Sequence, residues 1–229
     1  MNKNNLILRY VFFFLGLAVN SFGIAFITKS ALGTSPISSV PPISSVPYVC
    51  SLFFEGISFG AFTFIVNMLF IALQIILLKR DFHPIQFLQI AVNILFSSII
   101  DISMAALDWF QPEAFPVQIL SLLLGCTILA FGISIEVAPN VVVVPGEGVV
   151  RAIAKVRKAD FGKTKVCFDV TLILTALCLS FLFFGSLQGL GIGTLISALI
   201  VGKIVSFINR RLPLVAWVKG LESEIPVRT

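Results

Sequence analysis

Six long apolar stretches divide this chain, and the charged residues fall almost entirely between them. Each stretch is close to the ~20 residues that a helix needs to cross a bilayer core of ~30 Å. Because lipid cannot bond to backbone N–H and C=O groups, each segment must pair them internally as a helix. The sequence therefore predicts an all-α, polytopic membrane protein with six transmembrane helices, at Leu6–Ile27, Phe59–Leu78, Ile85–Leu107, Val117–Val137, Val166–Phe184 and Leu190–Ile208.

Composition limits the chemistry that such a chain can perform. Of its 229 residues 58% are hydrophobic and only 12% are charged, which leaves little sequence for a water-soluble domain. A single histidine, His83, and four cysteines without C-x-x-C spacing are too few to build a zinc or iron site. No Ser/His/Asp set or phosphate-binding loop is present either. We therefore expect no metal, no cofactor and no catalytic residues, and a protein that is not an enzyme.

The positive charges indicate how the chain is oriented. If the N-terminus lies in the cytoplasm, most lysines and arginines also lie there, including the six between Arg151 and Lys165. The outer side then holds Lys29, the acidic loop with Asp108 and Glu113, and the uncharged turn 185–189. This bias follows the positive-inside rule and predicts that both termini are cytoplasmic. Topology explains the basic residues, so we do not expect a nucleic-acid partner.

The two halves of the chain resemble each other. Shifting the sequence by 109 residues places Leu15-Gly16 on Leu124-Gly125, Phe22-Gly23-Ile24 on Phe131-Gly132-Ile133, and Pro36 on Pro145. After the proline the shift becomes 102, which places Phe59-Gly60 on Phe161-Gly162 and Asn67 on Asp169. Three spans per unit would make the second copy enter the membrane from the opposite side, as in many transporters. Chance similarity between apolar sequences is the alternative.

The predicted organisation is a 3+3 inverted repeat with two short non-spanning helical segments. Its parts are a first repeat (1–107), an extracytoplasmic loop (108–116), a second repeat (117–211) and a cytoplasmic tail (212–229).

The first non-spanning segment follows the first span. There Ser35 can cap a helix whose first residue is Pro36, and the later prolines Pro41, Pro42 and Pro47 should break any regular helix that follows. This segment either dips into the membrane or lies on the bundle as an extracellular loop.

The second segment starts at Pro145-Gly146-Glu147-Gly148 and continues as a basic amphipathic helix. Three of its cations share one face, where anionic lipid headgroups would bind: Arg151, Lys155 and Lys158. Glu147 either caps this helix or faces a cation or proton in a polar cavity.

Polar residues within the spans are candidate sites, because ionisable groups are costly in a membrane. Depth moderates the cost for Glu136 and Asp169, which lie near the cytoplasmic ends of their spans. We predict that Glu147 and Asp169 face one polar cavity, with Asn67 and Ser35 approaching from the other repeat. The alternative is that Glu147 is only a cap and Asp169 only pairs with Lys165. The predicted substrate- or ion-binding residues are Glu147, Asp169, Asn67, Ser35, Asn20 and Asp101.

Several motifs resemble a known family of small bacterial membrane proteins, the YczE/YyaS/YitT family. They are Leu32-Gly-Thr-Ser-Pro36, Glu55-Gly-Ile-Ser-Phe-Gly60, Pro145-Gly-Glu-Gly148, and Phe161-Gly-Lys-Thr-Lys165 with Asp169. The resemblance extends roughly over residues 6–211. Such proteins usually have Pro-Gly-Asp-Gly where this chain has Glu147. The resemblance implies a multi-pass protein of the bacterial plasma membrane and implies no particular substrate.

Two functions are compatible with these observations. The inverted repeat and the paired positions of Asn67 and Asp169 favour a small secondary transporter or channel-like carrier of an ion or small molecule. The alternative is a non-transporting scaffold or regulator that docks a partner through the basic cytoplasmic helix. The expected partners are the lipid bilayer, anionic headgroups and, for a carrier, its substrate.

Overall fold

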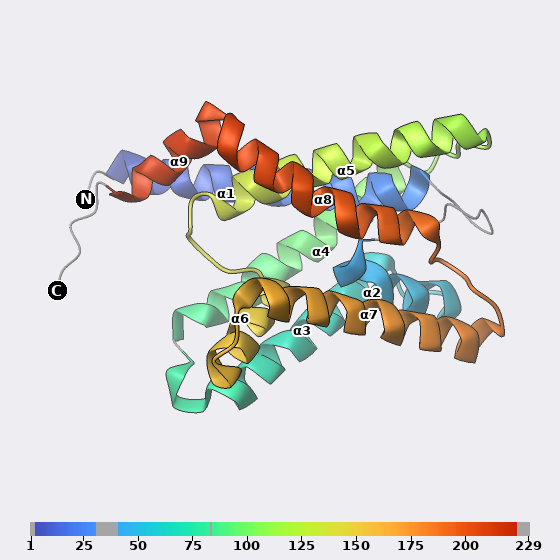
Figure 1. Cartoon of the computed structure of the whole chain (residues 1–229), viewed down its shortest axis with the longest axis horizontal. Coiled ribbons are helices and arrows are strands. Elements are labelled where there is room, and N and C mark those ends of the chain that lie inside the picture. Colours follow the sequence, from blue (N-terminus) through green and yellow to red (C-terminus); the bar gives the residue numbers. More distant parts are fainter. Residues whose placement is uncertain (1–2, 31–40, 83, 224–229) are drawn as a thin grey trace.

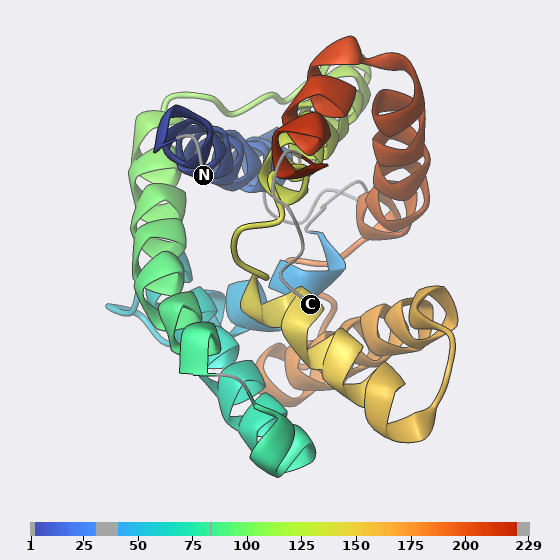
Figure 2. The same ribbon diagram turned by 90° about the vertical axis from the view of Figure 1, so that its left-hand side faces the viewer.

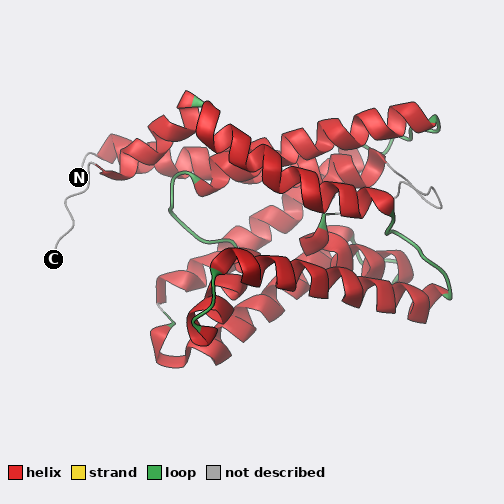
Figure 3. Ribbon diagram, in the orientation of Figure 1, coloured by secondary structure: helices red, strands yellow, loops and turns green. Residues whose placement is uncertain are grey.

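Helices joined by loops make up the structure, a computed structural model that describes residues 3–30, 41–82 and 84–223 (Figure 3). Six helices in these ranges are long and apolar enough to cross a membrane. They are α1 (Lys3–Ser30), α3 (Phe59–Leu78), α4 (Leu88–Ala106), α5 (Phe115–Val137), α7 (Phe161–Phe184) and α8 (Ile192–Arg211). The prediction of an all-α protein with six membrane-spanning helices is confirmed.

The long helices alternate in direction along one axis of the molecule (Figure 1). As a result, the start of α1 and the end of α8 lie at the same end of the bundle, together with α9 (Pro213–Ser223). We call this the α9 end. Large apolar side chains cover the outside of the spans, such as Leu182, which is 76% exposed, and Leu199. An apolar surface of this extent is unfavourable in water, whereas it is the surface expected of helices that contact lipid.

Local sequence sets where α3 and α7 begin. The Ser58 side chain accepts a hydrogen bond from the N–H of Ala61, and the Asp160 carboxylate accepts one from the N–H of Lys163. Both side chains act as N-caps, and each is followed by Phe-Gly. Because of its cap, α7 starts five residues before the predicted apolar run, and its first turn is polar.

Residues 213–223 of the predicted tail form the helix α9. Its buried valines, Val215 and Val218, pack in a cluster with Ala130 of α5 and Ile208 of α8. The ring of Trp217 meets the ring of Phe12 edge-on, at 5.7 Å between centroids. An amphipathic helix of this kind lies along the bundle instead of crossing it.

Two short helices, α2 (Pro42–Phe53) and α6 (Pro145–Arg157), each pack against both α3 and α7 (Figure 2). The expectation that the prolines would break any helix is wrong for α2. Pro42 occupies a first-turn position, where no N–H is needed, and Pro47 removes only one backbone hydrogen bond. The predicted helix start at Ser35 and Pro36 lies outside the described residues. Pro145 begins α6 as predicted.

The helices α1 and α5 cross in close, antiparallel contact. Glycines allow the approach: a Cβ atom at Gly16 would lie 2.3 Å from the backbone nitrogen of Glu136. The 109-residue shift relates these contacts to one another. It takes Gly16 to Gly125, and it takes Ile27, which Gly125 contacts, to Glu136, which Gly16 contacts. The pairs are Gly16 with Glu136, Gly125 with Ile27, Gly23 with Leu129, and Gly132 with Asn20.

Candidate functional site

A buried carboxylate, Glu136, lies at this helix crossing. Its side chain is 3% exposed, and Nδ2 of Asn20 donates a hydrogen bond of 2.5 Å to its Oε2 atom. Its Oε1 atom is buried and has no hydrogen-bond partner among the described residues. A buried polar atom without a partner costs free energy, and an unpaired carboxylate charge costs more. Glu136 is therefore the residue in the described structure that most needs a functional explanation.

The depth of Glu136 differs from the sequence-based expectation. It is the second-last residue of α5, which placed it near a membrane surface when α5 was considered alone. However, Glu136 packs against Gly16, near the middle of the apolar run Leu6–Ile27 of α1. At the α9 end, α1 extends well beyond the last residue of α5 (Figure 1). Measured against α1, the carboxylate is deep in the bundle.

A small cavity adjoins Glu136. Its volume is about 10 Å³, enough for about one water molecule. The chain between α5 and α6 contributes Asn140 and the run 142–144, and α6 contributes Glu147 and Arg151. The Arg151 guanidinium lies 3.6 Å from Oε2 of Glu147, whose side chain is 25% exposed. The cavity is therefore lined by both a buried glutamate and a glutamate that water can reach.

Arg9 holds the chain that leaves α5. Its guanidinium donates hydrogen bonds of 2.9 and 2.7 Å to the backbone carbonyl of Pro139 and one of 3.3 Å to that of Asn140. These carbonyls follow the helix end, where backbone acceptors lack helical partners. The buried Arg9 therefore fixes the segment that forms one wall of the cavity.

Close packing at the start of α6 positions Glu147. A Cβ atom at Gly146 would lie 2.6 Å from Cδ1 of Ile43, and one at Gly148 would lie 2.5 Å from Oε1 of Gln74. The Gln74 amide also donates to the Pro145 carbonyl at 3.2 Å. A side chain at either position would have to push these neighbouring side chains aside, so the two glycines let the first turn of α6 pack this closely. That placement brings Glu147 to the cavity.

The structure does not place Asp169 at this cavity within the described part of the chain. Its carboxylate pairs with Lys165 at 2.5 Å, one helical turn earlier. The second carboxylate that lines the cavity with Glu147 is therefore Glu136. The pairing of Asp169 with Lys165 was the alternative that the spacing of four residues offered.

Asn67 and Asp101 have structural partners elsewhere. The Asn67 amide donates to Oδ1 of Asn93 at 2.8 Å, which links α3 to α4. Asp101 accepts hydrogen bonds from the Ser58 hydroxyl at 2.5 Å and from the N–H of Gly60 at 2.7 Å, which links α4 to the start of α3. Ser35 lies outside the described residues. Of the six predicted site residues, Glu147 lines the cavity, and Asn20 is hydrogen-bonded to Glu136, which also lines it.

The cations predicted to bind lipid headgroups lie on the exposed side of α6. Lys155 is bonded to Asp81 at 2.7 Å, and Arg151 is shared between Glu147 and the face of the Phe161 ring at 6.0 Å. Lys158 ends α6 in a left-handed conformation. Two of the three cations thus already have carboxylate partners.

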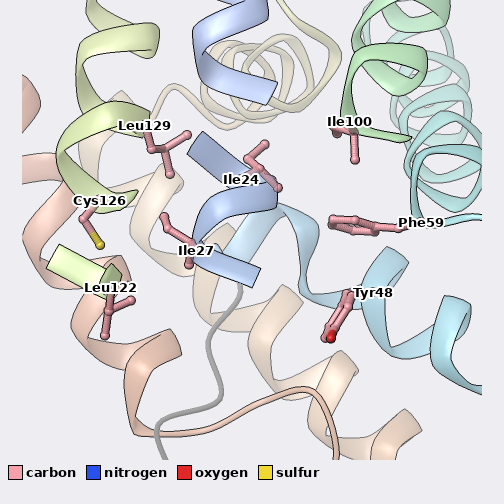
Figure 4. Close-up of a cluster of buried hydrophobic side chains, with 8 residues drawn as sticks. All are labelled: Ile24, Ile27, Tyr48, Phe59, Ile100, Leu122, Cys126 and Leu129. Carbon is pink, nitrogen blue, oxygen red and sulfur yellow. The ribbon is translucent and has the colours of Figure 1, made fainter. Parts of the chain in front are cut away.

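The counterpart of the Asn20–Glu136 pair is apolar. A shift of 109 residues takes Asn20 to Leu129 and Glu136 to Ile27, and both are buried in the cluster that Figure 4 shows. The two positions of this crossing that the shift relates therefore differ in chemistry while sharing their glycine contacts. A glutamate in an otherwise apolar segment was a sequence signal for this site. However, the position of Glu136 near the end of α5 wrongly indicated that it lies close to the membrane surface.

A bundle of six membrane-spanning helices around a buried carboxylate and a small polar cavity defines this chain as a multi-pass integral membrane protein. Residues 7–210 match the model of a family of unknown function, DUF6198, and the chain belongs to that family. No curated protein and no solved structure matches the chain. Membership of this family does not test the resemblance to the YczE/YyaS/YitT family, which stays a prediction.

Proposed function

We propose that this protein is a small secondary transporter or channel-like carrier whose substrate path passes the cavity at Glu136. One observation carries the proposal: a membrane-spanning helix buries a carboxylate that has an unsatisfied oxygen and borders a cavity. Ionisable residues inside membrane proteins are costly, and they typically mark ion or substrate pathways. A scaffold or regulator would have no need of such a buried carboxylate.

The packing of the two halves supports a carrier with an inverted repeat. The short helix of each half packs against the second span of the other half, α2 on α7 and α6 on α3. The reciprocal glycine contacts at the α1–α5 crossing support such a relation between the halves. Carriers with inverted repeats switch access by moving one half against the other around a central site. The Asn20–Glu136 pair joins the two halves, which suits that role.

We further propose that the α9 end faces the cytoplasm of a bacterial plasma membrane. The described basic side chains are concentrated at that end, on α6, on the first turns of α7 and at the end of α8. Lys29 is at the opposite end, in the last turn of α1. The positive-inside rule then assigns the orientation.

An uptake experiment that presupposes no substrate tests the proposal. Proteoliposomes containing the full chain are incubated with a mixture of small metabolites and salts, and mass spectrometry identifies what accumulates inside. We expect at least one compound to enter wild-type vesicles and not empty vesicles, and Glu136→Gln to reduce its uptake at least tenfold. Glu113→Gln makes the same change in an exposed loop and should transport normally.

Asp169→Asn provides a second comparison. Because Asp169 is paired with Lys165 outside the cavity, this variant should keep most of the uptake. If no compound enters wild-type vesicles in any gradient, or if Glu136→Gln transports as well as wild type, the proposed function is wrong. Equal loss in Asp169→Asn and Glu136→Gln would move the site toward α7.

A further inference from the structure

We infer that Glu136 carries the coupling proton of this protein, and that the proton reaches it through the cavity that it shares with Glu147. The inference rests on the proposed transport function, because it names the ion that drives that function. The step is simple: the carboxylate binds one proton at Oε1 and becomes a neutral carboxylic acid, and the reverse step releases the proton.

The hydrogen bonds around Glu136 leave one oxygen for this purpose. Asn20 donates to Oε2, and that bond can persist whether Oε1 is protonated or not. Oε1 faces no donor in the described structure. Protonation therefore removes the buried charge without breaking the contact that orients the side chain.

The same geometry disfavours a metal cation. The cavity has room for about one water molecule, and the Asn20 amide presents its N–H group, a donor, to the carboxylate. Hard cations such as Ca²⁺ and Mg²⁺ need about six or more oxygen ligands. No group of three His, Cys, Asp or Glu side chains that could hold a metal ion occurs among the described residues.

Charged groups on the neighbouring helices shape the path. On α6, Glu147 and Arg151 line the cavity, and on α1, Arg9 binds the Pro139 and Asn140 carbonyls beside it. The helices α8 and α9 also pack against α5, and their lysines, Lys203 and Lys219, are exposed. Glu147 is thus the carboxylate of the cavity that combines contact with water and access to Glu136.

Glu147 then acts as a relay and not as the storage site. Its carboxylate pairs with the Arg151 guanidinium at 3.6 Å, whereas no cation among the described residues forms an ion pair with Glu136. A proton arriving from water would pass Glu147 and a single water molecule before reaching Oε1 of Glu136.

Infrared difference spectroscopy detects the protonated acid directly and needs no substrate. Full-length protein in lipid films is titrated between low and high pH, and the carbonyl stretch of a protonated carboxylic acid is followed in H₂O and D₂O. We expect one band that shifts in D₂O, disappears as the pH rises, and is absent from Glu136→Gln. Glu136→Asp should retain a titrating band at a different frequency, and Glu113→Gln should retain the wild-type band.

Three outcomes would overturn the inference. One is a wild-type spectrum without a titrating buried acid, and another is a band that survives unchanged in Glu136→Gln. The third is a Glu136 carboxylate band that shifts with added NaCl at constant pH but not with pH, which would assign the site to sodium. Each result is independent of transport, so a failed uptake experiment with a positive infrared result would reject the carrier and keep the proton site.

The role of Glu147 has its own readout. After a pH jump, the Glu136 band should change at least tenfold more slowly in Glu147→Gln than in wild type, while reaching the same final amplitude. An unchanged rate would remove Glu147 from the path.

Discussion

The amide of Asn20 donates a 2.5 Å hydrogen bond to the Glu136 carboxylate across the crossing of α1 and α5. At the equivalent position of the same crossing, Leu129 of α5 and Ile27 of α1 belong to one apolar cluster. Two helices thus use one packing pattern twice, once around a polar pair and once around an apolar pair. This difference allows each contribution to be tested separately.

Replacing the polar pair Asn20–Glu136 with the apolar residues of its counterpart, Leu and Ile, should separate its effect on stability from its effect on function. Asn20→Leu alone leaves the Glu136 carboxylate without its donor, and we expect it to lower the free energy of unfolding by about 2–4 kcal/mol. The double variant Asn20→Leu/Glu136→Ile should regain most of that loss, because a buried polar pair can be replaced by an apolar pair at little cost. Denaturant titration in mixed micelles measures both. Additive losses in the double variant would show that the two side chains are not coupled.

The glycines of the crossing should tolerate no side chain. In Gly16→Ala the new methyl group would meet the backbone of Glu136, which cannot move aside, and we expect a loss of about 1–3 kcal/mol in the free energy of unfolding. Gly202→Ala is the matched control on α8, since a Cβ atom there meets no described atom within 4 Å. It should be neutral or stabilising by up to about 1 kcal/mol. Melting temperatures in detergent measure both effects. A lower melting temperature for Gly202→Ala than for Gly16→Ala would contradict the close packing of α1 on α5 at Gly16.

Chemical labelling should show which side of the membrane each loop faces. In a background without Cys50, Cys126, Cys167 and Cys178, a membrane-impermeant maleimide added to whole cells should label Glu113→Cys and not Lys158→Cys. Lys158→Cys should react only after the cells are permeabilised, because Lys158 ends α6 at the α9 end. The reverse labelling pattern would invert the proposed orientation.

An ion pair at the opposite end of the bundle should make stability depend on pH. Lys29 bonds Asp108 at 2.7 Å, and this hydrogen bond, together with the lysine charge, lowers the pKa of Asp108 below its usual value. A lowered folded-state pKa stabilises the protein above the unfolded-state pKa of about 3.9, and the contribution is lost as the pH falls through the folded-state value.

Wild type should therefore melt at a higher temperature than Asp108→Asn at about pH 6, and the difference should shrink toward about pH 3. The effect should be small, since the Asp108 side chain is 77% exposed. Glu113→Gln changes another carboxylate of the same loop and controls for the loss of charge. A difference that stays constant over this range would rule out the ion pair as its source.

The spans and their number follow from the sequence alone, because the bilayer imposes strict rules. A segment that crosses it must be apolar, about 20 residues long and helical, and those properties are local. Pro145 at the start of α6 is likewise a local signal, since proline suits a first turn. The shifts of 109 and 102 residues predict which residues of the two halves correspond, also without any coordinates.

Tertiary structure alone decided which polar residues meet. Local sequence indicated the Lys165–Asp169 pair, because four residues on one helix bring side chains together. The Asn20–Glu136 hydrogen bond joins residues 116 positions apart. It depends on the position of α1 along α5, which is set by the close contacts at the glycines. The depth of Glu136 is also set by α1 and not by α5. A residue's distance along its own helix gives its depth only if that helix spans the whole bundle, and α5 ends short of α1.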